Sequence, residues 1–239
     1  MISGVSPSLR RSPPVDTVTL PATVNRAFFC GGPLDYWGAV RYSMHAGEVA
    51  ESLAGLVRAG GAETARPLLE HAINGVLDAL AKADDTAGGL DDLLNRLLAA
   101  HAEACRLTPP DPCWLASWLV EVQFTGPWCP VQIGEYADPL TSDGLAAYRA
   151  EVRRRWTADP ESLPARYAVE QMARQDRDVV MLVDVIGGDL QHPAQYGRLA
   201  RALRDIGEVD AARQWAERGL AEHPDDPPGA GLRTFLARL

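Results

Sequence analysis

Apolar residues recur at helical spacing along most of the chain. In residues 65–80 they follow the i, i+3, i+4, i+7 pattern without a miss, and residues 90–105 repeat it. Alternation with a period of two, which is typical of strands, is almost confined to the short TVTL stretch near the N-terminus. The pattern therefore predicts an all-α protein. Shorter stripes of the same spacing lie at residues 115–122, 165–172, 179–186 and 232–239.

Residues that start or stop helices lie between these stripes. Asp111 followed by Pro112 predicts an N-cap and a first helical residue. Ser142 precedes a further stripe, and the Gly60-Gly61 pair predicts a C-terminal stop. Helices of about 10 to 20 residues joined by links of about 2 to 6 residues would pack as antiparallel neighbours.

Residues 193–226 have the layout of one complete helix pair. Gly207 would end the first helix, and Leu203 would fill the space between the two helices. Ala212 and Gly219 are small enough to let the second helix approach closely. A unit of about 34 residues with this pattern is typical of tetratricopeptide repeats. We therefore expect a right-handed, tetratricopeptide-like α-solenoid of antiparallel helix pairs.

A second stretch, residues 47–77, repeats this spacing. Gly60 stands five residues before Ala65, as Gly207 stands before Ala212. The regions 90–124, 130–157 and 162–187 keep only the outline of a helix pair. Such divergence is expected when neighbouring repeats stack into a solenoid.

Composition limits the domain organisation and the function. The Ser- and Pro-rich residues 1–24 predict a flexible tail, and residues 25–239 predict the helical-repeat domain, with a subdivision near residue 158. The formal net charge of -9 argues against direct binding of nucleic acid or of an anionic membrane. No stretch approaches the roughly 20 apolar residues of a membrane span, and the tail lacks the apolar core of a secretory signal. A cytoplasmic protein with reduced cysteines is the expectation.

Several stretches of the chain resemble the helical region of actinobacterial SWIM zinc-finger proteins. They are AHAEAC, PPDP, DGLAAYRAEVRRRW and YGRLARALRDIGEVDAARQWAERGL, within about residues 25–225. The resemblance implies a tetratricopeptide-like solenoid whose role is poorly defined. The zinc finger of that family, a C-x-C pair followed by C-x-H, has no counterpart here, because no cysteine lies two residues from another. The function of the finger therefore cannot be transferred.

One group of residues has the chemistry of a metal site. His101 and Cys105 lie one turn apart, and Cys113 and Cys129 could complete four zinc ligands. The alternative is a core histidine beside buried thiols, because His101 and Cys105 lie on the apolar stripe and no C-x2-C pair is present. Cys30, next to a Gly-Gly turn, would need a nearby histidine to act as a nucleophile. Phosphate-binding and dinucleotide motifs are absent from the sequence, so no cofactor is expected.

Two surfaces are candidates for binding a partner. Trp114 and Trp128 lie beside turns in the stretch richest in aromatic residues, and tryptophan is enriched at binding hot spots. The alternative is that they belong to the core between helices. Arg201 and Arg204, with Arg174, could bind a partner's carboxylate from the first helices of the C-terminal pairs. The alternative there is ordinary solvated arginine.

These observations predict a noncatalytic scaffold that binds another protein or peptide, or a second copy of itself. Two alternatives stay open. The first is an enzyme or small-molecule-binding protein whose pocket lies between helices and has no sequence motif. The second is a regulatory subunit of a nucleic-acid-binding assembly, suggested by the zinc-finger resemblance alone. A deep enclosed pocket with convergent polar groups would favour the enzyme, and a long open groove would favour the scaffold.

Overall fold

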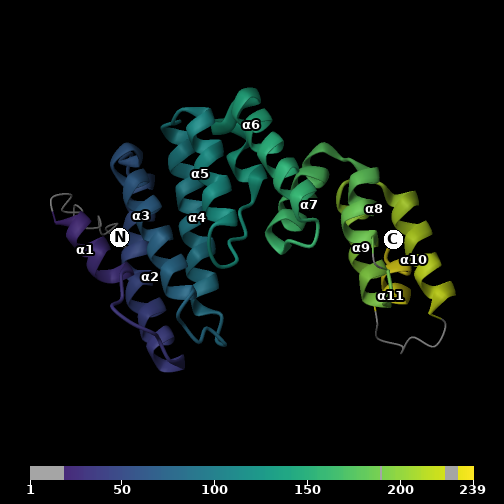
Figure 1. The fold of residues 1–239 in the computed structure, drawn as a ribbon, viewed down its shortest axis with the longest axis horizontal. Helices are drawn as coiled ribbons and strands as arrows, with labels where there is room; N and C mark the ends of the chain where they lie inside the picture. Colours follow the sequence, from purple (N-terminus) through teal and green to yellow (C-terminus); the bar gives the residue numbers. More distant parts are fainter. Residues whose placement is uncertain (1–18, 189, 224–230) are drawn as a thin grey trace, which may run out of the picture. The chain divides into compact units, whose positions relative to one another are not determined.

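The computed structural model describes residues 19–188, 190–223 and 231–239 (Figure 1). Within these residues the chain forms helices and no strand, apart from an isolated bridge between Leu34 and Ala83. The all-α prediction is confirmed. The elements are α1 (Leu20–Phe28), α2 (Tyr36–Arg58), α3 (Ala62–Leu80), α4 (Gly89–Leu107), α5 (Pro112–Phe124), the 3₁₀ helix η1 (Ile133–Tyr136), α6 (Ala137–Ala158), α7 (Leu163–Asp176), α8 (Val179–Gly187), α9 (Pro193–Asp205), α10 (Val209–Glu222) and α11 (Leu232–Leu236).

The chain divides into two compact units, residues 1–104 and residues 105–239. The boundary falls inside α4, whereas the sequence suggested a subdivision near residue 158. Both units bury apolar residues, and in the second unit one cluster of buried residues joins the end of α7 to α8, α9, α10 and α11.

The first unit begins with α1, which starts earlier than the sequence suggested. Pro21 lies in its first turn, and Leu20 and Val24 are buried on one face. The flexible tail expected up to residue 24 therefore extends too far, because residues 20–24 are part of this helix. Residues 1–18 lie outside the described part of the chain.

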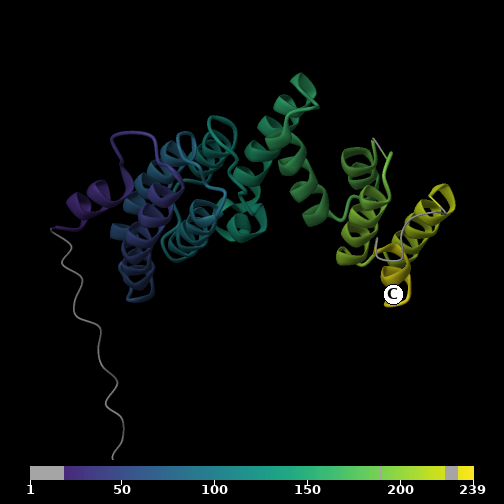
Figure 2. The same ribbon diagram turned by 90° about the horizontal axis from the view of Figure 1, so that it is seen from below.

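Helices α2 and α3 pack along each other (Figures 1 and 2). Asp35 caps α2, because its carboxylate accepts a hydrogen bond from the Gly38 amide at 2.6 Å. Gly60 has a φ of +91°, a conformation that favours glycine, and the expected helix stop at this position is confirmed. Almost all of the predicted apolar stripes of α3 and α4 are buried.

The second unit begins at the predicted helix start. The Asp111 carboxylate accepts a hydrogen bond from the Trp114 amide at 2.8 Å, and Pro112 is the first residue of α5. Helix α6 packs along α5 but is interrupted at Thr141, whose φ is +55°. Its regular part therefore begins at Ser142, where the sequence predicted a helix start.

Helices α9 and α10 form the pair predicted from residues 193–226. Leu203 and Ala212 are fully buried between them. A Cβ atom at Gly219 would lie 2.7 Å from the Cβ of Tyr196, so only glycine allows this approach of the two backbones. Helix α11 is shorter than its apolar stripe suggested, and the expected end of the unit at 224–226 lies outside the described residues.

Candidate functional site

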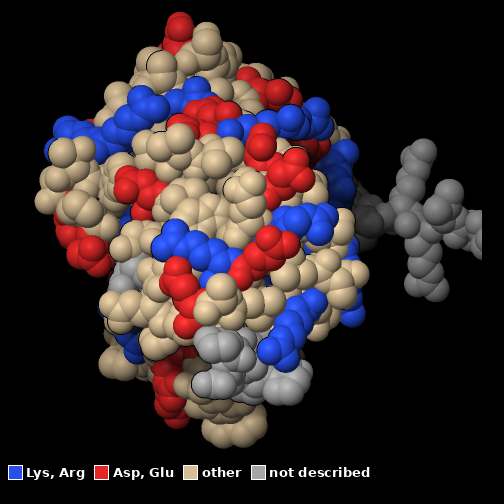
Figure 3. Space-filling view, turned by 90° about the vertical axis from the view of Figure 1, so that its right-hand side faces the viewer, with Lys and Arg blue, Asp and Glu red and all other residues tan. Residues whose placement is uncertain are grey.

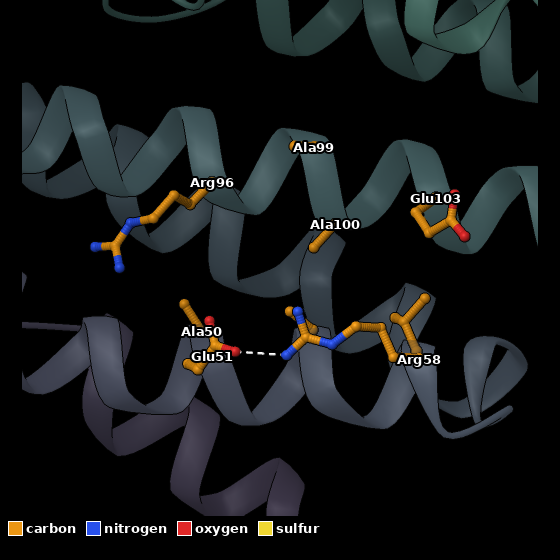
Figure 4. Close-up of a pocket in the computed structure, with 9 residues that line it drawn as sticks. Ala50, Glu51, Arg58, Arg96, Ala99, Ala100 and Glu103 are labelled. Atoms are coloured by element: carbon orange, nitrogen blue, oxygen red, sulfur yellow. Dashed lines mark hydrogen bonds and ion pairs between the residues drawn. The ribbon is translucent and has the colours of Figure 1, made fainter.

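An open groove runs between α2 and α4 in the first unit (Figure 4). The groove exists because both helices carry small side chains where they line it. One hollow of about 290 Å³ has the alanines 50, 54, 99 and 100 together with Val57 along its floor. Ala100 points from α4 towards α2 in Figure 4. The small side chains leave the groove open where larger residues would have filled it.

Charged residues stand at both ends of this hollow. In Figure 4, Arg96 lies towards one end and Glu103 towards the other, and the Arg58 side chain extends back along α2 to Glu51. Arg58 and Glu51 form an ion pair along α2, with 2.5 Å between Nη2 and Oε1. The hollow therefore combines an apolar floor with a charged rim.

A second hollow of about 620 Å³ continues the groove towards the beginnings of α2 and α4. It shares Glu51 and Arg96 with the first, and it adds Met44, Glu48 and Asp92. The Arg96 guanidinium lies over Gly47 of α2. A Cβ atom at this glycine would be only 3.2 Å from the guanidinium. Arg96 thus marks the division between the two hollows.

Large apolar side chains are exposed on α2 at this end. Met44 is 69% exposed and Trp37 is 65% exposed, and the two lie seven residues apart on the same helical face. The Trp37 ring packs edge-on against Tyr36, with 5.1 Å between ring centroids. A tryptophan this exposed next to an open groove is typical of a binding surface.

This groove is not among the surfaces predicted from the sequence. Residues 37, 40, 44, 47, 51, 54 and 58 recur at alternating spacings of three and four, which forms a second stripe on α2 beside the buried one. The spacing of that stripe can be recognised in the sequence. Its small members, however, look the same in a packed core as on an open face.

The structure brings together two of the three predicted binding arginines. Arg204 pairs with Asp205 at 2.9 Å, and Arg174 approaches the other oxygen of that carboxylate at 3.7 Å. Arg174 also pairs with the buried Glu170 at 2.8 Å. Both guanidinium groups therefore already contact carboxylates of the chain. Arg201 is exposed and, among the described residues, has no ion pair.

Arginines and carboxylates also alternate elsewhere in this part of the chain. Figure 3, which faces the right-hand end of Figure 1, shows basic and acidic side chains intermixed on the surface. Arg218, for example, pairs with Glu222 at 2.7 Å. The binding role of Arg201, Arg204 and Arg174 stays a prediction.

The predicted tryptophans are both partly exposed. Trp114 is 42% exposed and Trp128 is 41% exposed. Trp128 packs edge-on against Tyr167, with 4.8 Å between ring centroids, and Gln132 donates a hydrogen bond to the Tyr167 hydroxyl at 2.6 Å. Trp128 therefore anchors the loop after α5 onto α7. A role in binding stays a prediction for both.

His101 is a core histidine of the first unit. Its ring is fully buried, and Nε2 lies 3.5 Å from the Glu70 carboxylate, which also accepts a hydrogen bond from Arg66 at 3.3 Å. Burial lowers the pKa of His101, although Glu70 acts in the opposite direction. The zinc alternative would need the histidine and the thiols in one cluster.

The cysteines occupy different environments. Cys105 and Cys129 are buried, and Cys113 is exposed. Burial raises the pKa of Cys129 to about 12, which makes this thiol a poor nucleophile. In the part of the chain that the structure describes, no three His, Cys, Asp or Glu side chains are grouped so that they could hold a metal ion. Cys30 is partly exposed in the loop after α1.

Comparisons with protein families, with curated proteins and with solved structures found no match to this chain. The resemblance to SWIM zinc-finger proteins therefore stays an expectation. None of the helices in the described ranges is both long and apolar enough to cross a membrane.

Proposed function

We propose that this chain is a noncatalytic helical scaffold that binds a peptide segment of another protein in the groove between α2 and α4. The observation that carries the proposal is the groove itself, which is open, has an apolar floor and has charged residues at its ends. An open groove suits an elongated peptide, whereas enzyme pockets enclose most of a small substrate. Exposed Met44 lines the second hollow, and exposed Trp37, two turns earlier on the same face of α2, extends the apolar surface beyond it.

The proposal includes a right-handed, tetratricopeptide-like solenoid. Its support is the match between two helix pairs that are far apart in the sequence. Residues 59–61 link α2 to α3, and residues 206–208 link α9 to α10, with Gly60 and Gly207 both at a φ near +90°. In such repeats the first helices of successive pairs line the binding face, and α2 and α4 would be two of these first helices.

A selection for binding peptides tests the proposal. Peptides from a phage library of random dodecapeptides would be selected on the full chain, and their affinities measured by fluorescence anisotropy. Ala100→Arg places a long charged side chain in the groove and should weaken binding by about tenfold or more. Ala150→Arg makes the same change at an exposed position of α6 and should leave affinity unchanged. Peptides that bind both variants equally well, or no selected peptides, would refute the proposal.

A further inference from the structure

We propose that the segment bound in this groove carries a lysine or arginine directly beside its apolar side chains, and that Glu48 and Asp92 hold this basic group. The inference rests on the proposed function of the groove and specifies the chemistry of its occupant.

The charges that line the second hollow are the first support. Three acidic residues, Glu48, Glu51 and Asp92, line this hollow together with one basic residue, Arg96. Arg58 already neutralises Glu51 through the ion pair on α2. Glu48 and Asp92 have no ion pair among the described residues, so the hollow keeps an excess of negative charge. A cation entering it would gain two partners.

The surroundings add to this negative field. Helix α4 begins with Asp91 and Asp92, and Asp85 accepts hydrogen bonds from the amides of Leu90 and Asp91. Burial, followed by the charges of Asp85 and Asp92, raises the pKa of Asp91. Residues 19–104 contain eleven Asp and Glu but six Lys and Arg. An acidic segment would be repelled here, and a basic one would be attracted.

The position of the acidic hollow sets the order of residues in the occupant. Met44 lines the same hollow as Glu48 and Asp92, and the alanine floor begins at the next turn of α2. Because Glu48 lies between Met44 and these alanines on α2, a basic group held at Glu48 and Asp92 would have apolar side chains on both sides, one against Met44 and the others against the alanines. Residues 44–58 of α2 span about 21 Å, which six or seven extended residues would cover.

Charge reversal tests this inference. The selected peptides should share a Lys or Arg next to apolar residues, and the double variant Glu48→Lys with Asp92→Lys should weaken their binding about tenfold or more. The loss should shrink as salt is raised, because salt screens exposed charges. Asp184→Lys with Glu217→Lys makes the same change of net charge at exposed positions of α8 and α10, and it should leave affinity nearly unchanged.

The outcomes separate the two proposals. Peptides that lose affinity in Ala100→Arg but lack a basic residue, or that bind the charge-reversed chain normally, would overturn this inference and leave the groove as a binding site. Peptides insensitive to Ala100→Arg would overturn both. If circular dichroism shows that the charge-reversed variant is unfolded, Glu48→Gln with Asp92→Asn removes the same charges and should still weaken binding several-fold; normal binding by that variant would also overturn the inference.

Discussion

At the scale of single residues, Glu170 shows how this chain compensates a buried charge. Its side chain, on α7, is almost fully buried, and it pairs with Arg174 on the same helix and with Arg198 on α9. A carboxylate without partners in this position would be strongly destabilising. The pairing therefore fixes α7 to α9 through two guanidinium groups that are themselves partly in solvent.

We expect Glu170→Gln to destabilise the protein by about 1–3 kcal/mol, because it removes charge-assisted hydrogen bonds from a buried position. The cost stays below that of a fully buried pair, since Arg174 and Arg198 can turn into water. Urea unfolding followed by circular dichroism measures the change. Glu151→Gln, which removes a partly exposed carboxylate paired with Arg154 and Arg155, is the control and should have little effect. Equal effects of the two substitutions would contradict this account.

His101 predicts a dependence of stability on pH. Burial holds its pKa below the ordinary value, so the unfolded chain takes up a proton as the pH falls past about 6.5, while the folded chain does not. Stability is therefore complete above that pH and is lost as the pH falls towards the lowered pKa, by at most about 1.4 kcal/mol per pH unit.

The urea midpoint measured between pH 7.5 and 5.5 tests this dependence. In His101→Gln the part of the slope that comes from this residue should disappear, since glutamine does not titrate. His71→Gln, at an exposed histidine that stacks on Phe29, should keep the slope of the unchanged protein. The account fails if the slope of His101→Gln matches that of the parent chain.

At the scale of elements, Thr141 interrupts α6. Its φ of +55° and ψ of −173° lie in a region that is nearly restricted to glycine, and a β-branched residue there is strained by about 1–3 kcal/mol. Thr141→Gly should remove this strain and, after the entropy of glycine in the unfolded chain is subtracted, raise stability by about 1 kcal/mol. Thr157→Gly, at an exposed position in the regular part of α6, should lower it slightly. Thermal unfolding compares the two, and a loss of stability in Thr141→Gly would show that the interruption is not strained.

The sequence predicts the elements well where each depends on nearby residues. The stripes of α3 and α4, the Asp111 cap and the Gly60 and Gly207 stops involve positions within one or two turns of each other. No nearby residue indicates the interruption at Thr141, because glycine is the residue expected in this backbone conformation and threonine is not. The predicted tail overlapped the beginning of α1 because Pro21 is equally compatible with a flexible tail and with a helix start.

The candidate site was harder to predict because it depends on contacts between distant residues. The groove needs small residues of both α2 and α4, such as Ala54 and Ala100, to line one hollow without a side chain that fills it, and nothing near either alanine in the sequence indicates this. Arg201 and Arg204 are exposed on α9, as a role in binding requires. Arg204 and Arg174 both pair with the carboxylate of Asp205. Arg174 and Asp205 are about 30 positions apart, so helical spacing could not predict this pairing.

At the scale of the whole molecule, the two compact units suggest that stability is distributed between two cores. Leu69 is fully buried in the first unit, and Leu203 is fully buried between α9 and α10 in the second. Apolar side chains stabilise mainly the atoms that they contact, so a cavity in one core should weaken that core far more than the other.

We therefore expect Leu69→Ala and Leu203→Ala each to cost about 2–5 kcal/mol, with the loss confined to the unit that holds the residue. Hydrogen exchange measured by mass spectrometry should show faster exchange in α9 and α10 of Leu203→Ala and unchanged protection in α2 and α3. Leu69→Ala should give the converse pattern. Binding of selected peptides to the α2–α4 groove should then survive Leu203→Ala but weaken in Leu69→Ala, because only the second substitution loosens the helices around the groove. Uniform loss of protection along the chain in both variants would show that the units unfold together, and the separate-core interpretation would be wrong.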